Sequence, residues 1–114
     1  MKIISAEEFL KLPMNTLYSK YTPCVFGALQ IKGDTLSGAF DYASQQIVDA
    51  IDCTGSDDFF DKLTDAEENG TSLKMDFDCC GRDGMFDRQQ LYAVWEQSDV
   101  VLLIERLKLC LDNQ

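Results

Sequence analysis

Carboxylates are the side chains of this sequence with the most capacity for chemistry, and several of them share the spacing of one helix face. Asp57, Asp61 and Asp65 recur at every fourth residue, and Glu68 falls close to the same side. Four residues of α-helix rise about 6 Å, so this spacing predicts a ladder of negative charge. Two interpretations stay open: the ladder imitates a run of phosphates and engages a nucleic-acid-binding protein, or it is the solvated face of an acidic protein.

A second acidic group follows this predicted helix, within the stretch that holds all of the chain's excess charge. Between Asp41 and Asp87, thirteen carboxylates stand against three basic residues, a net charge of −10, while the rest of the chain is neutral. Such a surface repels nucleic acid and anionic membranes, so we expect neither as a direct partner. It suits a basic partner or a demand for solubility. The candidate partner-binding residues are Asp57, Asp58, Asp61, Asp65, Glu67, Glu68, Asp76, Asp78, Asp83 and Asp87.

The segment from Asp76 to Asp87 is similar in part to an EF-hand calcium loop. Acids occupy the first, third and last loop positions, and Gly81 supplies the central glycine. However, Cys80 takes a ligand position, where a hard cation prefers oxygen, and Arg82 adds a positive charge. We therefore predict a hairpin turn here and no metal site.

The residue types give catalysis little support. The sequence has no histidine, which excludes Ser–His and Cys–His pairs, and it has no glycine-rich phosphate-binding motif. Cys79 and Cys80 are adjacent and lack the spacing of a zinc or redox site. The prediction is a protein that is not an enzyme and needs no cofactor.

The chain shows no secretory or membrane-spanning pattern. Its first apolar residues are followed at once by Ser5 and Glu7, and its longest apolar run is only Val100–Ile104. Five cysteines, an odd number, are best read as free thiols in a reducing compartment. We expect a cytoplasmic protein.

Three helices are expected to position these side chains. Ser5 and Glu8 form a capping box at the start of the first, which Pro13 ends. Ser56 begins the second, and Gly70 closes it. The expected helices span residues 5–12, 56–69 and 100–111, the last capped by Ser98 and Asp99.

The expected strands lie between these helices. Residues 40–51 fit either a helix face or a returning strand, and the turn before them favours the strand. Residues 73–79 alternate between apolar and polar, as in a strand with one buried face. The other expected strands are 24–31 and 91–95, with turns at 32–35 and 81–84. The prediction is a single domain over residues 1–114, an α+β fold with a small three- or four-stranded, mostly antiparallel sheet packed with two or three helices.

The last predicted helix is apolar on more than one side. Its main stripe, expected to face the core, is Val100, Leu103, Ile104, Leu107 and Leu111. Val101, Leu102 and Leu109 extend the apolar surface beyond that stripe. Either this helix is buried between elements, or these three residues form a self-association contact in a homodimer.

Several short segments resemble those of small acidic proteins encoded by phages and prophages. The segments are Leu12–Pro13, Thr16–Tyr18, Tyr21, Phe26–Gly27, Ile31–Gly33, Arg82–Asp87, Gln90–Glu96 and Asp99–Val100. The resemblance implies life in the cytosol of an infected bacterium. It also implies inhibition of host defence or transcription through occupation of nucleic-acid sites.

These observations predict a binding protein of phage type that inhibits a host nucleic-acid-binding protein, such as a CRISPR effector, through a surface that mimics nucleic acid. One alternative is an immunity protein that neutralises a basic nuclease toxin. In that case the gene of the toxin would lie directly beside the gene of this protein. Another is a structural or housekeeping phage protein whose charge serves solubility.

Overall fold

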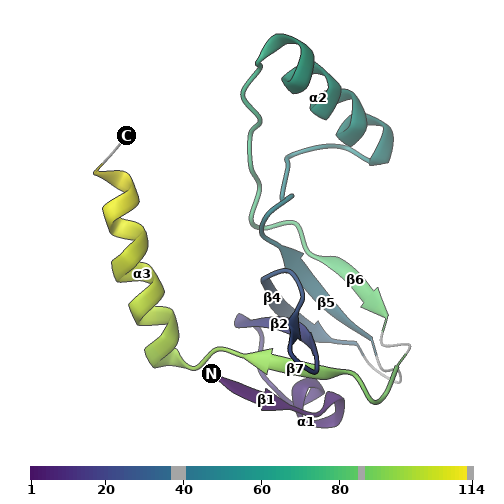
Figure 1. Ribbon diagram of the computed structural model, residues 1–114. Coiled ribbons are helices and arrows are strands. Elements are labelled where there is room, and N and C mark those ends of the chain that lie inside the picture. Colours follow the sequence, from purple (N-terminus) through teal and green to yellow (C-terminus); the bar gives the residue numbers. More distant parts are fainter. Residues whose placement is uncertain (37–40, 85–86, 113–114) are drawn as a thin grey trace.

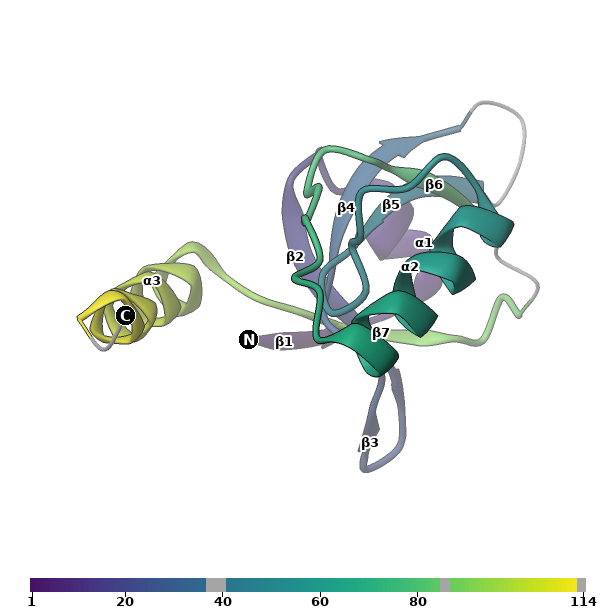
Figure 2. The ribbon, with the colours of Figure 1, turned by 90° about the horizontal axis from the view of Figure 1, so that it is seen from above.

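An antiparallel sheet forms the centre of the computed structural model, which describes residues 1–36, 41–84 and 87–112 (Figure 1). The strands in this part of the chain are β1 (Lys2–Ile4), β2 (Thr16–Thr22), β3 (Val25–Phe26), β4 (Gln30–Thr35), β5 (Asp41–Gln46), β6 (Gly81–Gly84) and β7 (Leu91–Val94). The helices are α1 (Ala6–Leu10), α2 (Ser56–Asn69) and α3 (Gln97–Leu111). The main sheet runs in the order β1-β7-β2-β4-β5-β6, and β3 pairs with β2 as a protruding hairpin (Figure 2).

The α+β class and the antiparallel pairing are confirmed, but the predicted strand number of three or four is wrong. Three strands, β1, β2 and β6, are missing from the prediction. Thr16–Thr22 carries mixed polar residues, yet it is a central strand that buries Tyr18. The predicted turn at 32–35 belongs to β4, and Cys24, which was expected to begin a strand, lies with φ 68° in the turn between β2 and β3. The returning strand is confirmed as β5, although Phe40, where it was expected to begin, lies outside the described residues.

The predicted strand at 73–79 is also wrong, and the predicted turn at 81–84 is a strand. Residues 73–79 form one isolated bridge, between Met75 and Ile51, and Phe77 is 54% exposed. The apolar side chains of this alternating segment therefore have no sheet face to pack against. Gly81–Gly84 extends along the open edge of β5, pairing Arg82 with Ala43, and thereby satisfies the backbone of that edge. Residues 85–86, which belong to the segment compared with an EF-hand, lie outside the described residues.

Four aromatic rings form the core where α1 covers the sheet. Phe9 on α1 is fully buried and stacks on Tyr92 with ring centroids 3.9 Å apart. It also contacts Tyr18 and Tyr42, at 4.7 and 5.0 Å. Ser5 is confirmed as the N-cap of α1, because the Glu8 N–H donates to the Ser5 hydroxyl at 3.2 Å, which is one of the two bonds of the predicted capping box. This local signal places Phe9 on the sheet.

Polar groups inside the core are paired. The Tyr18 hydroxyl lies 2.9 Å from the Gln30 side-chain oxygen and 2.7 Å from the Ser44 hydroxyl. Burial raises the pKa of Tyr18 to about 12. The Lys32 side chain is also buried, and its ammonium donates to the Gly33 carbonyl and the Thr35 hydroxyl. These bonds let strongly polar side chains occupy an interior that also holds the aromatic rings.

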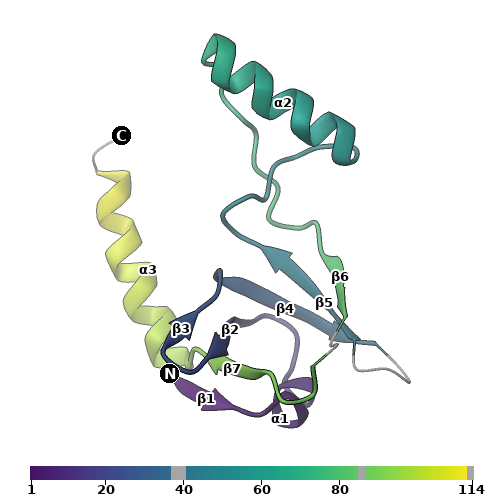
Figure 3. The same ribbon diagram turned by 45° about the vertical axis from the view of Figure 1, so that its right-hand side comes forward.

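The two longer helices do not pack on the sheet, which corrects the expectation that all helices cover it. Neither α2 nor α3 buries a side chain, and both project from the sheet (Figures 1 and 3). The capping of α3 also differs from the prediction, because Glu96 is its N-cap and forms a capping box with Asp99. In the described part of the chain, no helix is both long and apolar enough to span a membrane.

Candidate functional site

The predicted acidic helix, α2, is held away from the sheet by two segments of chain that run side by side. We call these two segments, residues 49–54 and 71–78, the stalk. The Asp52 N–H donates to the Lys74 carbonyl at 2.8 Å, and the Asp76 N–H donates to the Ala50 carbonyl at 2.7 Å. The isolated bridge between Ile51 and Met75 lies between these bonds. The stalk thus resembles a short two-stranded ribbon with α2 at its tip (Figure 3).

Buried Gln45 on β5 fastens the stalk to the sheet. The Gln45 side-chain oxygen accepts the Cys79 N–H at 2.6 Å, and its amide nitrogen donates to the carbonyls of Gln46 and Asp76 at 2.7 and 3.4 Å. Nothing in the local sequence marks this glutamine, because its role depends on a residue 34 positions away. The foot of the stalk is therefore fixed by a side chain that sequence reasoning missed.

One hydrogen bond joins the helix to the stalk, and part of the apolar side of the helix is half-buried. The Lys62 ammonium donates to the Asp52 carbonyl at 2.6 Å. Phe59 and Leu63, on the side of α2 opposite the acidic ladder, are half-buried, while Phe60 is 63% exposed. The predicted Ser56 cap is wrong, since Gly55 is the N-cap, but the predicted end is confirmed, with Gly70 in the left-handed region at φ 67°.

The ladder predicted from the spacing lies exposed on α2. We call Asp57, Asp61, Asp65 and Glu68 the acidic face; all four are exposed, as is Glu67. Within the described residues, none of these five forms an ion pair. The Asn69 side chain donates to Asp65 at 2.8 Å and holds the pKa of that carboxyl below its usual value.

Asp58 has a structural role at the start of the same helix. Its carboxylate accepts the Thr54 N–H at 2.9 Å and pairs with Lys62 at 3.2 Å. The Thr54 hydrogen bond, followed by the Lys62 bond, lowers the pKa of Asp58. Asp58 is therefore ionised at neutral pH, and Lys62 partly neutralises its charge.

The second acidic group is not brought together with the acidic face. Asp83 lies on β6, where it pairs with Lys20 at 3.2 Å and accepts a hydrogen bond from the Tyr42 hydroxyl at 3.3 Å. Asp76 and Asp78 lie at the foot of the stalk, and Asp87 follows β6 and accepts the Gln89 N–H. Figures 1 and 3 show the length of the stalk between α2 and β6. The ten candidate residues therefore form an acidic helix and a separate, partly paired set beside the sheet.

The sheet edge carries a further acid–base pair that the prediction did not single out. Arg82 on β6 binds Asp41 on β5 across the strand pair. This pair and the Lys20–Asp83 pair account for two of the carboxylates in the acidic stretch. In the described part of the chain, no group of three or more acidic or thiol side chains is arranged to hold a metal ion.

A comparison with known proteins finds no matching family model, no matching curated protein and no matching solved structure.

Proposed function

We propose that this chain is a non-enzymatic, acidic binding protein of phage type that inhibits a host nucleic-acid-binding protein, for example a CRISPR effector. In this proposal α2 docks on a basic groove as a mimic of nucleic acid. The observation that carries it is the placement of the acidic face: four exposed carboxylates that form no ion pair with any described residue, on a helix held off the sheet by its own stalk.

The placement supports binding over solubility as the use of the charge. Solubility requires charge anywhere on the surface, whereas here like charges repeat every four residues along one helix and destabilise it. The helix is nevertheless held in place: Lys62 bonds the helix to the stalk, and Gln45 bonds the foot of the stalk to the sheet. A rigid arm that presents repelling charges to solvent is what a charge-complementary interface needs.

Phe60 adds an apolar anchor to the same helix. Its ring is 63% exposed and contacts Phe59 edge-on, with ring centroids 5.4 Å apart. Exposed aromatic side chains near the centre of an interface often supply most of the binding energy, while charges steer the approach. We therefore expect association that is fast, weakened by salt and dependent on Phe60.

A charge-reversal experiment tests the proposal. The tagged protein is incubated with nuclease-treated lysate of the host bacterium, and retained proteins are identified at low and high salt. The test variant is Asp57→Lys/Asp61→Lys/Asp65→Lys. The matched control, Glu7→Lys/Asp34→Lys/Glu105→Lys, makes the same change of net charge at exposed sites away from α2.

Wild type and the control should retain the same basic nucleic-acid-binding protein, and the test variant should lose it. Adding wild type, but not the test variant, should release a fluorescent oligonucleotide from that protein. Two results would contradict the proposal: equal retention by test and control variants, or retention of no basic protein by wild type. The second result would assign the charge to solubility.

A further inference from the structure

The apolar stripe that was expected to face the core is exposed along most of α3. Val100 and Leu103 are half-buried at the base of the helix. Beyond them, Ile104, Leu107 and Leu111 are 48, 51 and 73% exposed. We call these three residues the apolar stripe. Exposed apolar surface of this extent on a helix marks an interaction site.

The opposite side of α3 is apolar as well, but less continuously. Leu102 and Leu109 are 69 and 54% exposed, and they lie a full two turns apart. Glu105 and Arg106 lie between them in the sequence and project toward the same half of the helix. The apolar stripe is thus the better-formed surface for helix packing.

An apolar groove opens at the base of the same helix. It has a volume of about 890 Å³, and Leu12, Pro13, Leu17, Val94, Val100 and Val101 are among its lining residues. On the other flank of the helix base, Met1, Trp95, Leu102 and Leu103 line a smaller hollow of about 440 Å³. One chain therefore presents both a projecting apolar helix and an apolar groove beside it. Two copies related by a twofold axis can place the helix of each in the groove of the other, because an isologous contact uses the same surface twice.

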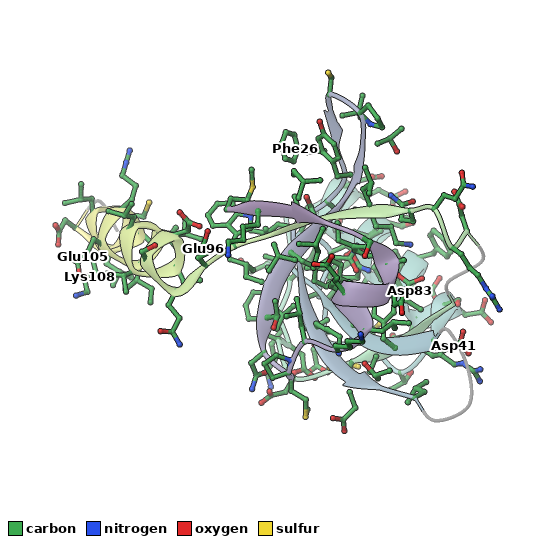
Figure 4. The ribbon with its side chains drawn as sticks, turned by 90° about the horizontal axis from the view of Figure 1, so that it is seen from below. Phe26, Asp41, Asp83, Glu96, Glu105 and Lys108 are labelled. Atoms are coloured by element: carbon green, nitrogen blue, oxygen red, sulfur yellow. The ribbon has the colours of Figure 1, made fainter. Side chains whose placement is uncertain are left out.

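The charge distribution identifies the occupant as a second copy. Within α3, Asp99 and Glu105 are balanced by Arg106 and Lys108, whereas residues 41–87 carry the net charge of −10. Figure 4 shows Asp41 and Asp83 on the opposite side of the molecule from Glu105 and Lys108. Two copies can therefore meet through α3 without bringing these sheet-edge carboxylates together, and Figures 1 and 2 show the acidic helix α2 set apart from α3, an arrangement that limits repulsion between like-charged chains. A basic partner, in contrast, is attracted to α2.

The dimensions also fit a pair of chains. A helix of this length extends about 22 Å, and Val100 and Val101 at its base line the groove, so helix and groove form one continuous surface for a second copy. We propose that the protein is a homodimer in which the apolar stripe of each α3 packs against α3 and the groove of the second copy. This contact lies on a different side of the helix from Leu102 and Leu109, which the sequence prediction grouped with Val101 as self-association residues, while Val101 itself lines the groove.

Light scattering after size exclusion tests this proposal on the full chain over a range of protein concentrations. A thiol reductant is present throughout, because Cys110 on α3 is exposed and could cross-link copies. Wild type should show twice the chain mass of 12.9 kDa. Two stripe variants, Ile104→Glu/Leu107→Glu and Leu111→Glu, should shift to the mass of one chain. The matched variant Leu102→Glu/Leu109→Glu makes the same chemical change on the other side and should stay largely dimeric.

Folding does not confound these variants, because α3 buries none of its side chains and Leu111 ends the helix. Circular dichroism checks that each variant keeps its sheet. The proposal is overturned if wild type has the mass of one chain at every concentration, or if the dimer persists in both stripe variants. It is also overturned if the dimer is lost only in the Leu102/Leu109 variant or equally in all variants. A one-chain wild type that sediments with neutral phosphatidylcholine vesicles would identify lipid as the occupant instead.

Discussion

The helices α2 and α3 invite comparison because they are similar in length, 14 and 15 residues, and both project from the sheet without burying a side chain. Their surfaces differ. The outer side of α2 is carboxylate, which water solvates well, and polar bonds from Lys62 and Gln45 hold the arm in place. The outer side of α3 is mostly leucine, isoleucine and valine. Exposure is therefore a stable condition for α2, whereas α3 gains free energy when apolar surface covers it.

The attachment of the two helices differs as well. α2 is connected to the sheet at both ends by the stalk. Among the described residues, α3 is held near its N-terminus, where Glu96 and Asp99 form the capping box and the Met1 ammonium lies 2.6 Å from Asp99. A helix fixed at one end can take up different directions, which suits a contact with a second chain. A helix fixed at both ends keeps its charges in one place, which suits recognition of a charged groove.

The largest expected effect separates the core from both projecting helices. Phe9→Ala removes a fully buried ring that contacts three tyrosines, and should lower the free energy of unfolding by about 3–5 kcal/mol. Leu107→Ala, measured at a dilution that disfavours association, should change it by no more than about 0.5 kcal/mol. Urea denaturation of both variants checks this. Similar decreases in the free energy of unfolding for the two variants would show that α3 contributes to the stability of the monomer as the core does.

The next effect concerns the anchoring of the arm. Gln45→Ala leaves the Cys79 N–H and the Asp76 carbonyl without their partner, and because Cys79 is exposed the loss should be that of an ordinary hydrogen bond, about 0.5–1.5 kcal/mol. The loss should be local: amide exchange should speed up in residues 49–80, while β2 and β7 remain protected. Gln89→Ala, at an exposed position, is the control. Uniform exchange changes over the whole sheet would mean that the arm and the sheet unfold as one unit.

The features that sequence predicted correctly are local ones. The Ser5–Glu8 cap and the Gly70 helix end depend on bonds within a few residues, and residues 91–94 have strong strand formers. The errors depend on distant partners. Gly81–Gly84 becomes a strand because β5 offers an open edge. The stripe of α3 stays exposed because Phe9 already covers the aromatic face of the sheet, so the amphipathic pattern of α3 has no core of its own to join. The sequence predicted the acidic spacing of α2, but it did not predict the stalk that holds this helix away from the sheet.

A smaller effect tests whether the acidic face is under electrostatic strain. Asp61→Asn removes the central charge of the face and with it the repulsion toward the carboxylates one turn away on either side. The variant should be more stable than wild type by about 0.2–0.5 kcal/mol for each like-charge pair that is removed. Thermal unfolding at low salt measures this, and the gain should shrink at high salt. In the lysate experiment the same variant should bind its basic partner more weakly. A variant that is no more stable at low salt would show that these charges are too well solvated to repel one another.

The smallest effect distinguishes the starts of the two helices by pH. The pKa of Asp58 on α2 and that of Asp99 on α3 are both lowered, Asp58 mainly by the Thr54 N–H and Asp99 mainly by the Met1 ammonium. A carboxyl with a lowered pKa in the folded state stabilises above its unfolded pKa, and that contribution is lost as pH falls through the folded value. Both helix starts should therefore loosen in acid.

Only α3 should also respond to alkali. The Met1 ammonium donates a hydrogen bond to Asp99, which raises the pKa of the Met1 amine above 8.0. The stabilisation that this pair gives the start of α3 is therefore present below pH 8.0 and is lost as the pH rises through the higher pKa of the folded state. Nuclear magnetic resonance shifts of residues 97–100 should follow this titration, while those of residues 56–60 should stay constant, because the Met1 ammonium bonds to the start of α3 and not to that of α2. Acetylation of the N-terminus removes the titrating amine and should abolish the response of α3. If the shifts of α3 still moved over the same pH range after acetylation, the Met1–Asp99 pair would not be what holds the single attached end of this helix.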